Sequence, residues 1–270
     1  MHKRLLVVTA HPDDEAFGPA GSLVKYADEG TEIHLLCATR GEAGQWSQTK
    51  GNRQKSRPKA DQPLAETGKS FDRIEIKDEV KLHHVREKEL LRSAKILGVK
   101  KVEFLDFIDG TLCNANYHQL AGKISKKINS FQPQVIMTME RLGVSGHLDH
   151  IAVSLTTTYA FLHTSFGNKL YYHCLPKENR EKDLDNYFIY FPEGYDQDDI
   201  TTRIDWSKYW DQKVKAMQQH QSQKQDVERI LKRIVKQAHV DHFILEHYRK
   251  ITPKFPETDL FEGIDPAERG

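Results

Sequence analysis

Two short clusters of histidine and acidic residues carry most of the chemistry that this sequence offers. The first is the string His11-Pro12-Asp13-Asp14-Glu15, and the second is Gly146-His147-Leu148-Asp149-His150. Imidazole nitrogens and carboxylate oxygens are typical ligands of catalytic zinc, which keeps one coordination position open. Residues three apart face the same side of a helix, so His147 and His150 could act together. Asp149 between them can accept a hydrogen bond from an imidazole and fix its tautomer.

Each cluster follows a predicted strand. A Val-rich apolar run over residues 5–8 precedes the first cluster, and a run over 135–139 precedes the second through a loop. Further strands are predicted over 33–38 and 101–107, and helices over 17–27, 85–97, 118–131 and 151–162. This alternation predicts a doubly wound, Rossmann-like, mostly parallel α/β sheet with helices on both faces. Ligands of such sheets bind at the carboxyl ends of the strands, so we expect the clusters to meet there.

The second half of the chain predicts a smaller strand and helix extension of the same single domain, 1–270. Strands are expected over 170–175, 187–191 and 200–206, helices over 207–223 and 226–237, and an irregular tail over 252–270. The polar segment 45–81 is predicted to be a surface loop. Because it leaves directly from the predicted site, it is also a candidate lid or substrate-selecting loop.

Composition excludes several classes of protein. The 270 residues contain 40 Lys and Arg against 39 Asp and Glu, so the net charge of +1 provides no broad surface for nucleic acid. No apolar run is long enough to span a membrane. The apolar stretch near the start is shorter than that of a secretory signal, which favours a cytoplasmic location. Cys37, Cys113 and Cys174 are too few and too scattered for a disulfide framework or a cysteine zinc site.

The HPDDE string followed far downstream by HxDH resembles the PIG-L (LmbE-like) family of zinc-dependent N-acetylglucosaminyl deacetylases. Further motifs occur in the order that this family has them. They are TRGE at 39–42, REKE at 86–89 with LGV at 97–99, DFIDGTL at 106–112 and HQSQ at 220–223. The resemblance covers residues 5–223, which is most of the chain.

The resemblance implies three zinc ligands, His11, Asp14 and His150, with Fe²⁺ as an alternative metal. Asp13 would be the general base on zinc-bound water, and His147 would stabilise the oxyanion or protonate the leaving amine. These roles suit amide hydrolysis, because zinc activates water and polarises a carbonyl while a side chain moves the proton.

The remaining site residues also come from the resemblance. Asp149 is expected to hold His147, and the substrate is expected to contact Glu42, Arg86, Asp109 and His220. The chain departs from the family at Leu148, at Ser145 and in the loop 140–143. These departures do not change the expected metal ligands. They concern the identity of the substrate and the groups that stabilise the oxyanion.

We therefore expect a hydrolase that removes an acetyl group from an N-acetylated amino sugar or its small-molecule conjugate. Two alternatives stay open: a metal amidohydrolase acting on a non-sugar amide or as a glycan-conjugate amidase, and a non-catalytic glycan-binding protein of the same fold. A nucleotide-binding oxidoreductase is disfavoured, since Gly18 and Gly21 do not match GxGxxG. No nucleic-acid or membrane partner is expected, and a homo-oligomer is left open.

Overall fold

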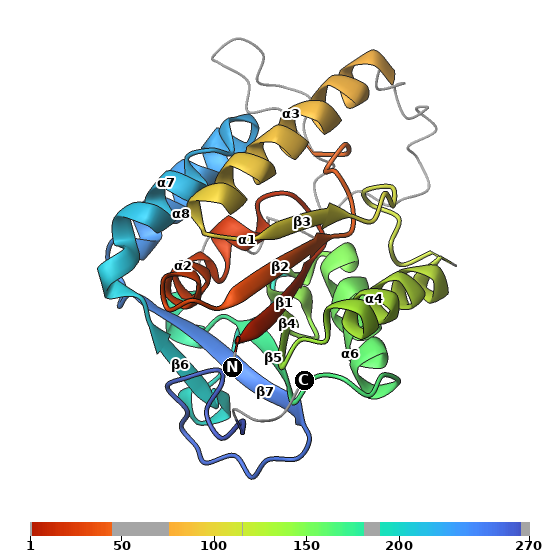
Figure 1. The fold of residues 1–270 in the computed structure, drawn as a ribbon. Coiled ribbons are helices and arrows are strands. Elements are labelled where there is room, and N and C mark those ends of the chain that lie inside the picture. The colour runs from red at the N-terminus through yellow and green to blue at the C-terminus, as the bar shows by residue number, and fades with distance from the viewer. Residues whose placement is uncertain (1, 45–75, 115, 181–189, 266–270) are drawn as a thin grey trace.

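A seven-stranded mixed sheet forms the centre of the molecule (Figure 1). The computed structural model describes residues 2–44, 76–114, 116–180 and 190–265. The strand order is β3-β2-β1-β4-β5-β7-β6, in which β1 to β5 run parallel and β7 runs antiparallel to both of its neighbours. The strands are β1 (Arg4–Thr9), β2 (Glu32–Cys37), β3 (Lys101–Phe104), β4 (Val135–Met139), β5 (Lys169–Cys174), β6 (Thr202–Asp205) and β7 (Val240–Tyr248).

Helices cover both faces of this sheet. Figure 1 shows α2, α3, α7 and α8 on one side and α4 and α6 on the other. The helices are α1 (Asp14–Phe17), α2 (Ala20–Asp28), α3 (Ile76–Ile96), α4 (Tyr117–Phe131), α5 (Gly143–Gly146), α6 (Leu148–Leu162), α7 (Trp210–Met217) and α8 (Lys224–Ile234). The predicted doubly wound α/β class is confirmed. No helix in the described part of the chain has both the length and the apolar character needed to cross a bilayer.

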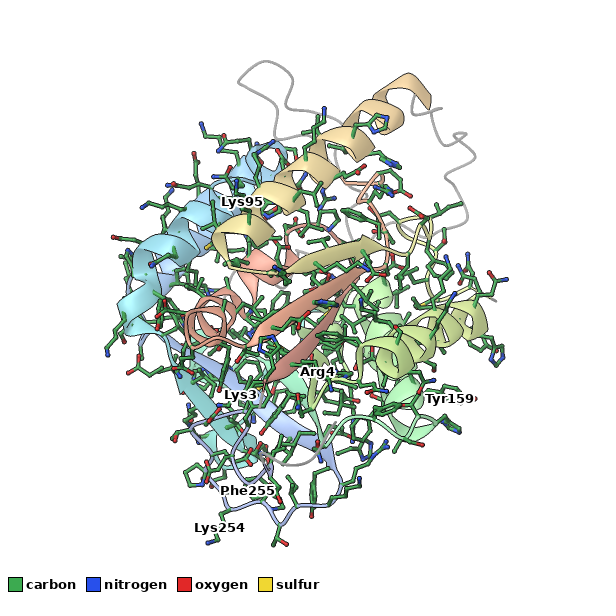
Figure 2. All side chains as sticks on the ribbon, in the orientation of Figure 1. Lys3, Arg4, Lys95, Tyr159, Lys254 and Phe255 are labelled. Atoms are coloured by element: carbon green, nitrogen blue, oxygen red, sulfur yellow. The ribbon has the colours of Figure 1, made fainter. Side chains whose placement is uncertain are left out.

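Strand β1 shows why the apolar runs of this sequence form central strands. Leu5 and Val7 pack with the helices of one face, while Leu6 and Val8 pack with α4 and α6 on the other. A parallel strand that is buried on both faces needs apolar residues at every position, rather than at alternate ones. Side chains fill the space between the sheet and both helix layers (Figure 2).

The chain leaves β1 and β4 toward opposite faces of the sheet. β1 continues into α1 and α2 on one face, and β4 leads through a loop to α6 on the other. Neighbouring strands that diverge in this way leave a crevice at their carboxyl ends, where α/β proteins bind ligands. Both sequence clusters lie in this crevice, one after each strand.

Several predicted boundaries were wrong. The helix expected over 17–27 is interrupted at Gly18 and Pro19, and the helix expected over 207–223 is reduced to α7 with 3₁₀ turns at both ends. Helix α3 begins at Ile76, so the end of the predicted 45–81 loop is helical, while residues 45–75 lie outside the described chain. The predicted strand 187–191 is not seen at 190–191, and its other residues also lie outside the described chain.

Strand β7, the longest in the described residues, was missed. Its sequence VDHFILEHY contains two acids and two histidines, so it lacks a continuous apolar run. The structure inserts it antiparallel between β5 and β6. Its buried Asp241 is satisfied by Lys213 Nζ at 3.2 Å and by the hydroxyl of Ser22 at 2.8 Å. A polar position of this kind is tolerated inside because its hydrogen bonds are made by distant elements.

Candidate active site

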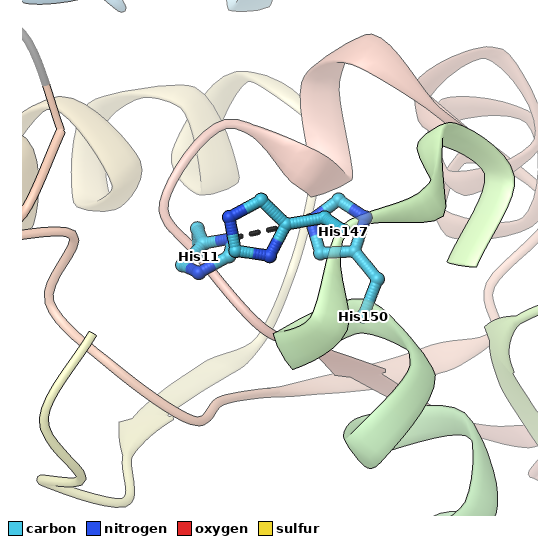
Figure 3. A group of neighbouring side chains, drawn as sticks. All are labelled: His11, His147 and His150. Carbon is cyan, nitrogen blue, oxygen red and sulfur yellow. Dashed lines mark hydrogen bonds between the residues drawn. The ribbon is translucent and has the colours of Figure 1, made fainter. Parts of the chain in front are cut away.

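Three potential metal ligands converge at the carboxyl ends of β1 and β4. His11 Nδ1 lies 3.1 Å from His150 Nε2, and Asp14 Oδ1 lies 3.2 Å from the same nitrogen. Asp14 Oδ2 is 4.0 Å from His11 Nδ1. Figure 3 shows the rings of His11, His147 and His150 gathered from the β1 loop and the start of α6, with the dashed line joining His11 and His150. These are the ligands expected from the sequence, brought together across 139 positions.

The protein holds the other ring nitrogen of each predicted histidine ligand. His11 Nε2 lies 2.9 Å from Asp109 Oδ1 and 3.3 Å from Asp149 Oδ2, so Nδ1 faces His150. His150 Nδ1 lies 2.9 Å from the carbonyl oxygen of Gly143, which leaves Nε2 for a ligand. Such partners fix the tautomer and orientation of metal-binding imidazoles.

A tight turn presents the acidic residues of the first cluster. Asp14 Oδ2 accepts hydrogen bonds from the backbone N–H of Ala10 at 3.0 Å and of His11 at 2.7 Å, so Oδ1 is the oxygen that faces His150. Asp13 adopts a positive φ of 115°, which is uncommon for a residue with a side chain. This conformation turns the chain so that the side chains of Asp13 and Asp14 point in different directions.

Electrostatics around the converged atoms favour a cation. Burial alone lowers the pKa of His11, but its bonds to Asp109 and Asp149 outweigh that effect and raise it to about 10. Burial tends to raise the pKa of Asp14, yet His150 and His11 hold it well below its ordinary value. Burial also tends to raise the pKa of Asp109, but its hydrogen bond to His11 and the charge of that ring lower it to about 2. Asp14, beside the converged nitrogens, and Asp109, on the far side of the His11 ring, are therefore ionised at neutral pH.

The donor set fits Zn²⁺. Two ligands about 2.0–2.1 Å from a tetrahedral zinc lie roughly 3.3–3.4 Å apart. The measured separations of 3.1 Å and 3.2 Å around His150 Nε2 are close to that spacing. Two imidazoles and one carboxylate also leave a coordination position for substrate or water.

Arg86 of α3 holds Asp13. Its Nη2 donates to Asp13 Oδ2 at 2.9 Å and to the carbonyl oxygen of Pro12 at 2.6 Å, and its Nη1 donates to the carbonyl oxygen of Gly41 at 2.9 Å. Burial raises the pKa of Asp13 to about 7, and Arg86 opposes that rise. These contacts position Asp13, and because Arg86 also lines the cleft, its expected contact with substrate stays a prediction.

The TRGE segment packs closely on this arginine. Gly41 has a φ of +73°, and a Cβ there would lie 2.5 Å from Arg86 Cζ. The next residue, Glu42, accepts a hydrogen bond from the Asp109 N–H at 2.9 Å, and Asp109 in turn accepts from the Ala43 N–H at 3.1 Å. Asp109 lines the cleft and orients His11. Substrate contact by Glu42 or Asp109 stays a prediction.

His147 caps the N-terminus of α6. Its Nδ1 accepts a hydrogen bond from the Asp149 N–H at 3.2 Å, so the neutral ring carries its proton on Nε2. Burial and the nearby imidazoles of His11 and His150 lower the pKa of His147 to about 4. The ring lies edge-on to His11, with centroids 4.7 Å apart, and lines the cleft. It can therefore offer a hydrogen-bond donor to a bound group.

The expected role of Asp149 needs a correction. Its carboxylate lies against His11 Nε2 and accepts from the backbone N–H of Gly110 at 2.7 Å and of Leu112 at 3.0 Å. It meets His147 through its backbone N–H. Because α6 starts at Leu148, the Asp149 side chain turns toward β1 and the 109–112 loop, where it orients His11, a predicted metal ligand.

His220 is also corrected. Its side chain is 0% exposed and does not line the cleft. His220 Nε2 lies 2.8 Å from Glu15 Oε1, so His220 supports the first cluster through Glu15. Burial tends to lower the pKa of His220, but the effect of the Glu15 carboxylate is larger, and the net result is a raised pKa. Glu15 also accepts from Ser93 Oγ at 2.6 Å and from the Asp13 N–H at 3.0 Å.

Glu140 is a positioning residue that sequence reasoning missed. It accepts from the backbone N–H of Leu142 at 2.7 Å, from that of Val144 at 2.5 Å and from the Tyr195 hydroxyl at 2.7 Å. These bonds shape the loop between β4 and the HxDH cluster, in which Val144 has a φ of 61°. The position of Glu140 directly after a parallel strand was the signal that could have identified it.

The predicted metal ligands lie at one end of a cleft of about 720 Å³, which we call the metal-binding end. From there the cleft continues along the ends of β5 and β7 to α8. The residues lining this second part include His173, Asn179, Lys213, Gln225, Asp226, Arg229, Arg233, Gln237, Asp241 and His242. The volume lies within the range usual for small-molecule sites.

A known protein family matches the part of the chain that contains both clusters. The PIG-L family model, described as GlcNAc-PI de-N-acetylase, matches residues 6–161, which is more than half of the chain. The chain belongs to the PIG-L family. The match runs from β1 to α6 and so contains both clusters. This family match and the relatives below confirm the predicted class of enzyme. That class is an N-deacetylase of amino-sugar derivatives, which is a hydrolase.

Curated relatives of this PIG-L protein include deacetylases that cover most of its length. A 1D-myo-inositol 2-acetamido-2-deoxy-alpha-D-glucopyranoside deacetylase from Thermobifida fusca is 30% identical over 82% of this chain and 83% of its own. A mycothiol S-conjugate amidase from Streptomyces coelicolor is 33% identical, but this match spans 58% of the chain and 51% of that protein.

Solved structures show the same fold at low sequence identity. An N,N'-diacetylchitobiose deacetylase from Pyrococcus horikoshii has a TM-score of 0.57 and 18% identity, covering 89% of this chain and 82% of that one. The 4-carboxy-2-hydroxymuconate hydratase GalB from Pseudomonas putida has a TM-score of 0.62 and 19% identity, covering 94% and 99%. Because the fold also supports a hydratase, the argument for function must come from the site.

Proposed function

We propose that this PIG-L protein is a zinc-dependent deacetylase of an N-acetylglucosamine conjugate. The proposal rests on the convergence of His11 Nδ1, Asp14 Oδ1 and His150 Nε2 beside the partly buried carboxylate of Asp13. These three atoms would hold the zinc, and Fe²⁺ is the alternative occupant of the same donors. When bound, the metal would polarise the amide carbonyl and lower the pKa of water in the site.

The chain itself supplies the proton transfers. Asp13, held by Arg86, accepts a proton as water attacks the amide carbon. His147 donates through Nε2–H to the oxygen that becomes negative, which is the oxyanion-stabilising one of its two expected roles. Asp13 then returns the proton to the departing nitrogen. The C–N bond breaks, and acetate and a free amine result.

The substrate class follows from the relatives and from the size of the cleft. Relatives of this chain are named for N-acetylglucosamine joined to inositol, as in Thermobifida fusca, or to L-malate, as in a Bacillus cereus protein that is 26% identical over 83% of this chain. The cleft extends well past the metal-binding end, so there is room for such a second group. We infer a small polar conjugate. The cytoplasmic location stays a prediction, and a homo-oligomer stays open.

A second candidate is an amidase for sugar amides with an acyl group larger than acetyl. The similarity to mycothiol S-conjugate amidase favours it, although that match covers about half of the relative. The same residues would perform the chemistry. The two candidates differ only in the acyl group that is released.

Acetate release decides between these possibilities. Zinc-loaded protein is incubated with N-acetylglucosamine glycosides and with matched glycosides bearing larger acyl groups. We expect acetate and free amine from the first set, and a loss of about 10²- to 10⁴-fold in kcat for Asp13→Asn with its zinc retained. Zinc-loaded protein that releases no acyl group from any sugar, or Asp13→Asn with full activity, would reject the proposal.

A further inference from the structure

Helix α6 is apolar on two faces. Its inner face packs against the sheet through buried side chains, which include Ala152, Val153 and Phe161. Its outer face is exposed in the described part of the chain. Four large apolar side chains on this outer face are each at least half exposed: Leu148, Leu155, Tyr159 and Leu162. Apolar residues all round a helix are typical of one that is buried on every side, so the outer face of α6 has the character of an interface.

The outer face also lacks charge. Residues 151–162 contain no Asp, Glu, Lys or Arg, although these types make up 29% of the chain. Helix α4, which packs beside α6, has a more ordinary surface. Its exposed residues are mainly polar or cationic and include His118, Gln119, Lys123 and Lys126. Monomeric proteins rarely expose a continuous apolar patch, and the absence of charge is typical of the centre of a protein–protein interface.

Two side chains at the edge of this face are already fixed by the protein. Thr158 Oγ1 donates to the carbonyl oxygen of Ser154 at 2.9 Å and lies 2.5 Å from the Tyr172 hydroxyl. Covering Thr158 would therefore leave no unpaired hydroxyl, which avoids the cost of burying a polar group. The Tyr159 ring, which Figure 2 shows at the outer edge of the molecule, stacks on His163 with centroids 3.9 Å apart.

A lipid surface does not fit this face. With 15 residues, α6 is too short to cross a bilayer. A helix that lies in the membrane surface turns a charged, usually cationic, face toward water. The opposite face of α6 is instead buried against the sheet. These features favour a protein partner.

The spacing of the outer residues favours a second copy of this chain. Leu155 is central, Ile151 and Tyr159 lie four residues to either side of it, and Leu148 and Leu162 lie seven residues to either side. The apolar positions therefore have the same order in both directions along the helix. A twofold axis at Leu155 that reverses the helix would place apolar residues against apolar residues along its whole length.

We propose that this protein forms a homodimer in which α6 packs antiparallel on α6 of the partner subunit, with Leu155 at the twofold axis. Twofold dimers are the commonest oligomers, and their two subunits use the same surface. Apolar residues spaced three and four apart form the ridges that pack two helices together. Because Leu148 lies between His147 and Asp149, the far end of the partner's helix would lie close to the metal-binding end of the cleft.

Sedimentation velocity over a range of concentrations tests the dimer. We expect the wild type to have twice the chain mass and Leu155→Lys to have the single chain mass, because two like charges would meet at the axis without counter-charges. Leu91→Lys is the matched control, since this leucine of α3 is 45% exposed on the other side of the sheet, and it should stay dimeric. Circular dichroism checks that the variants fold. A monomeric wild type, or any wild-type assembly whose mass Leu155→Lys leaves unchanged, would overturn the proposal.

Cysteine crosslinking gives an independent reading and tests the direction of packing. It uses a Cys113→Ser background, which removes the exposed native thiol. Leu155→Cys should crosslink two subunits on mild oxidation. The two copies of residue 148 would lie about 21 Å apart, so Leu148→Cys should crosslink only when mixed with Leu162→Cys. Failure of Leu155→Cys to crosslink would overturn the interface, and ready crosslinking of Leu148→Cys to itself would overturn the antiparallel arrangement.

Discussion

At the scale of single residues, the acids around His11 decide which nitrogen it presents. Asp109 and Asp149 both lie on Nε2, so Nδ1 faces His150 and Asp14. The residue types of the two clusters and their places after strands predicted a metal site, and the family resemblance assigned His11, Asp14 and His150 as its ligands. The partners could not be assigned in the same way, since they depend on how a loop and a helix start are oriented.

Asp109 provides the first test at this scale. Asp109→Asn should weaken zinc affinity by about 10- to 100-fold, because a neutral amide holds His11 Nε2 less firmly than a carboxylate does. A competition titration with a chelator measures the change. Asp106→Asn, three residues earlier and exposed, is the matched control and should bind zinc like the wild type. Equal affinity for both variants would contradict the role given to Asp109.

His220 tests the corrected assignment. His220→Ala should lower the free energy of unfolding by about 1–3 kcal/mol, because the buried Glu15 loses a hydrogen-bond partner. KM should stay near the wild-type value, since His220 lies outside the cleft. Urea unfolding and steady-state kinetics give the two readings, with the exposed His163→Ala as control. A large rise in KM with unchanged stability would instead support the original expectation that His220 contacts the substrate directly.

At the scale of elements, the loops after β1 and β4 hold the site in place. The β4 loop has little freedom, because Glu140 accepts two of its backbone N–H groups and the carbonyl of Tyr190 packs on Gly146. Gly146 has a φ of +74°, and a Cβ there would lie 1.9 Å from Tyr190 O. The glycine before HxDH is therefore required by both conformation and space.

Substituting that glycine should disturb the metal ligands. Gly146→Ala should lower the free energy of unfolding by about 2 kcal/mol or more and weaken zinc binding, because the clash is with backbone and His150 follows closely. Gly122→Ala, on the exposed side of α4 with nothing within 4 Å, should instead stabilise by about 0.5–1 kcal/mol. Thermal melts and zinc titrations compare the pair. Unimpaired zinc binding in Gly146→Ala would refute this account of the loop.

Elements were predictable where hydrophobic pattern alone decides them. Strand β4 was predicted over the residues it occupies, and α4 to within one residue, because their apolar periodicity is strong. Strand β7 was not, because its buried Asp241 looks like a surface residue until Lys213 and Ser22 are brought beside it. Patterns within a segment carry no information on such distant partners.

At the scale of the whole molecule, the site exists only when β1 and α6 are assembled. Zinc should therefore bind the folded state in preference to the unfolded chain and stabilise it. At a zinc concentration about 100 times the Kd, the gain is about 2.7 kcal/mol. For a domain of this size that corresponds to a rise in Tm of about 5–10 °C. Differential scanning fluorimetry of metal-free protein with and without zinc measures it, and His150→Ala should show no rise.

The most direct test of the central claim measures zinc content and acetate release in the same samples. Metal-free protein is titrated with zinc in the presence of an N-acetylglucosamine glycoside, for the wild type and for His150→Ala. We predict that wild-type activity rises with the first equivalent of bound zinc and then levels off, while His150→Ala neither retains zinc nor releases acetate. Full acetate release by the metal-free protein, or by His150→Ala, would contradict the account.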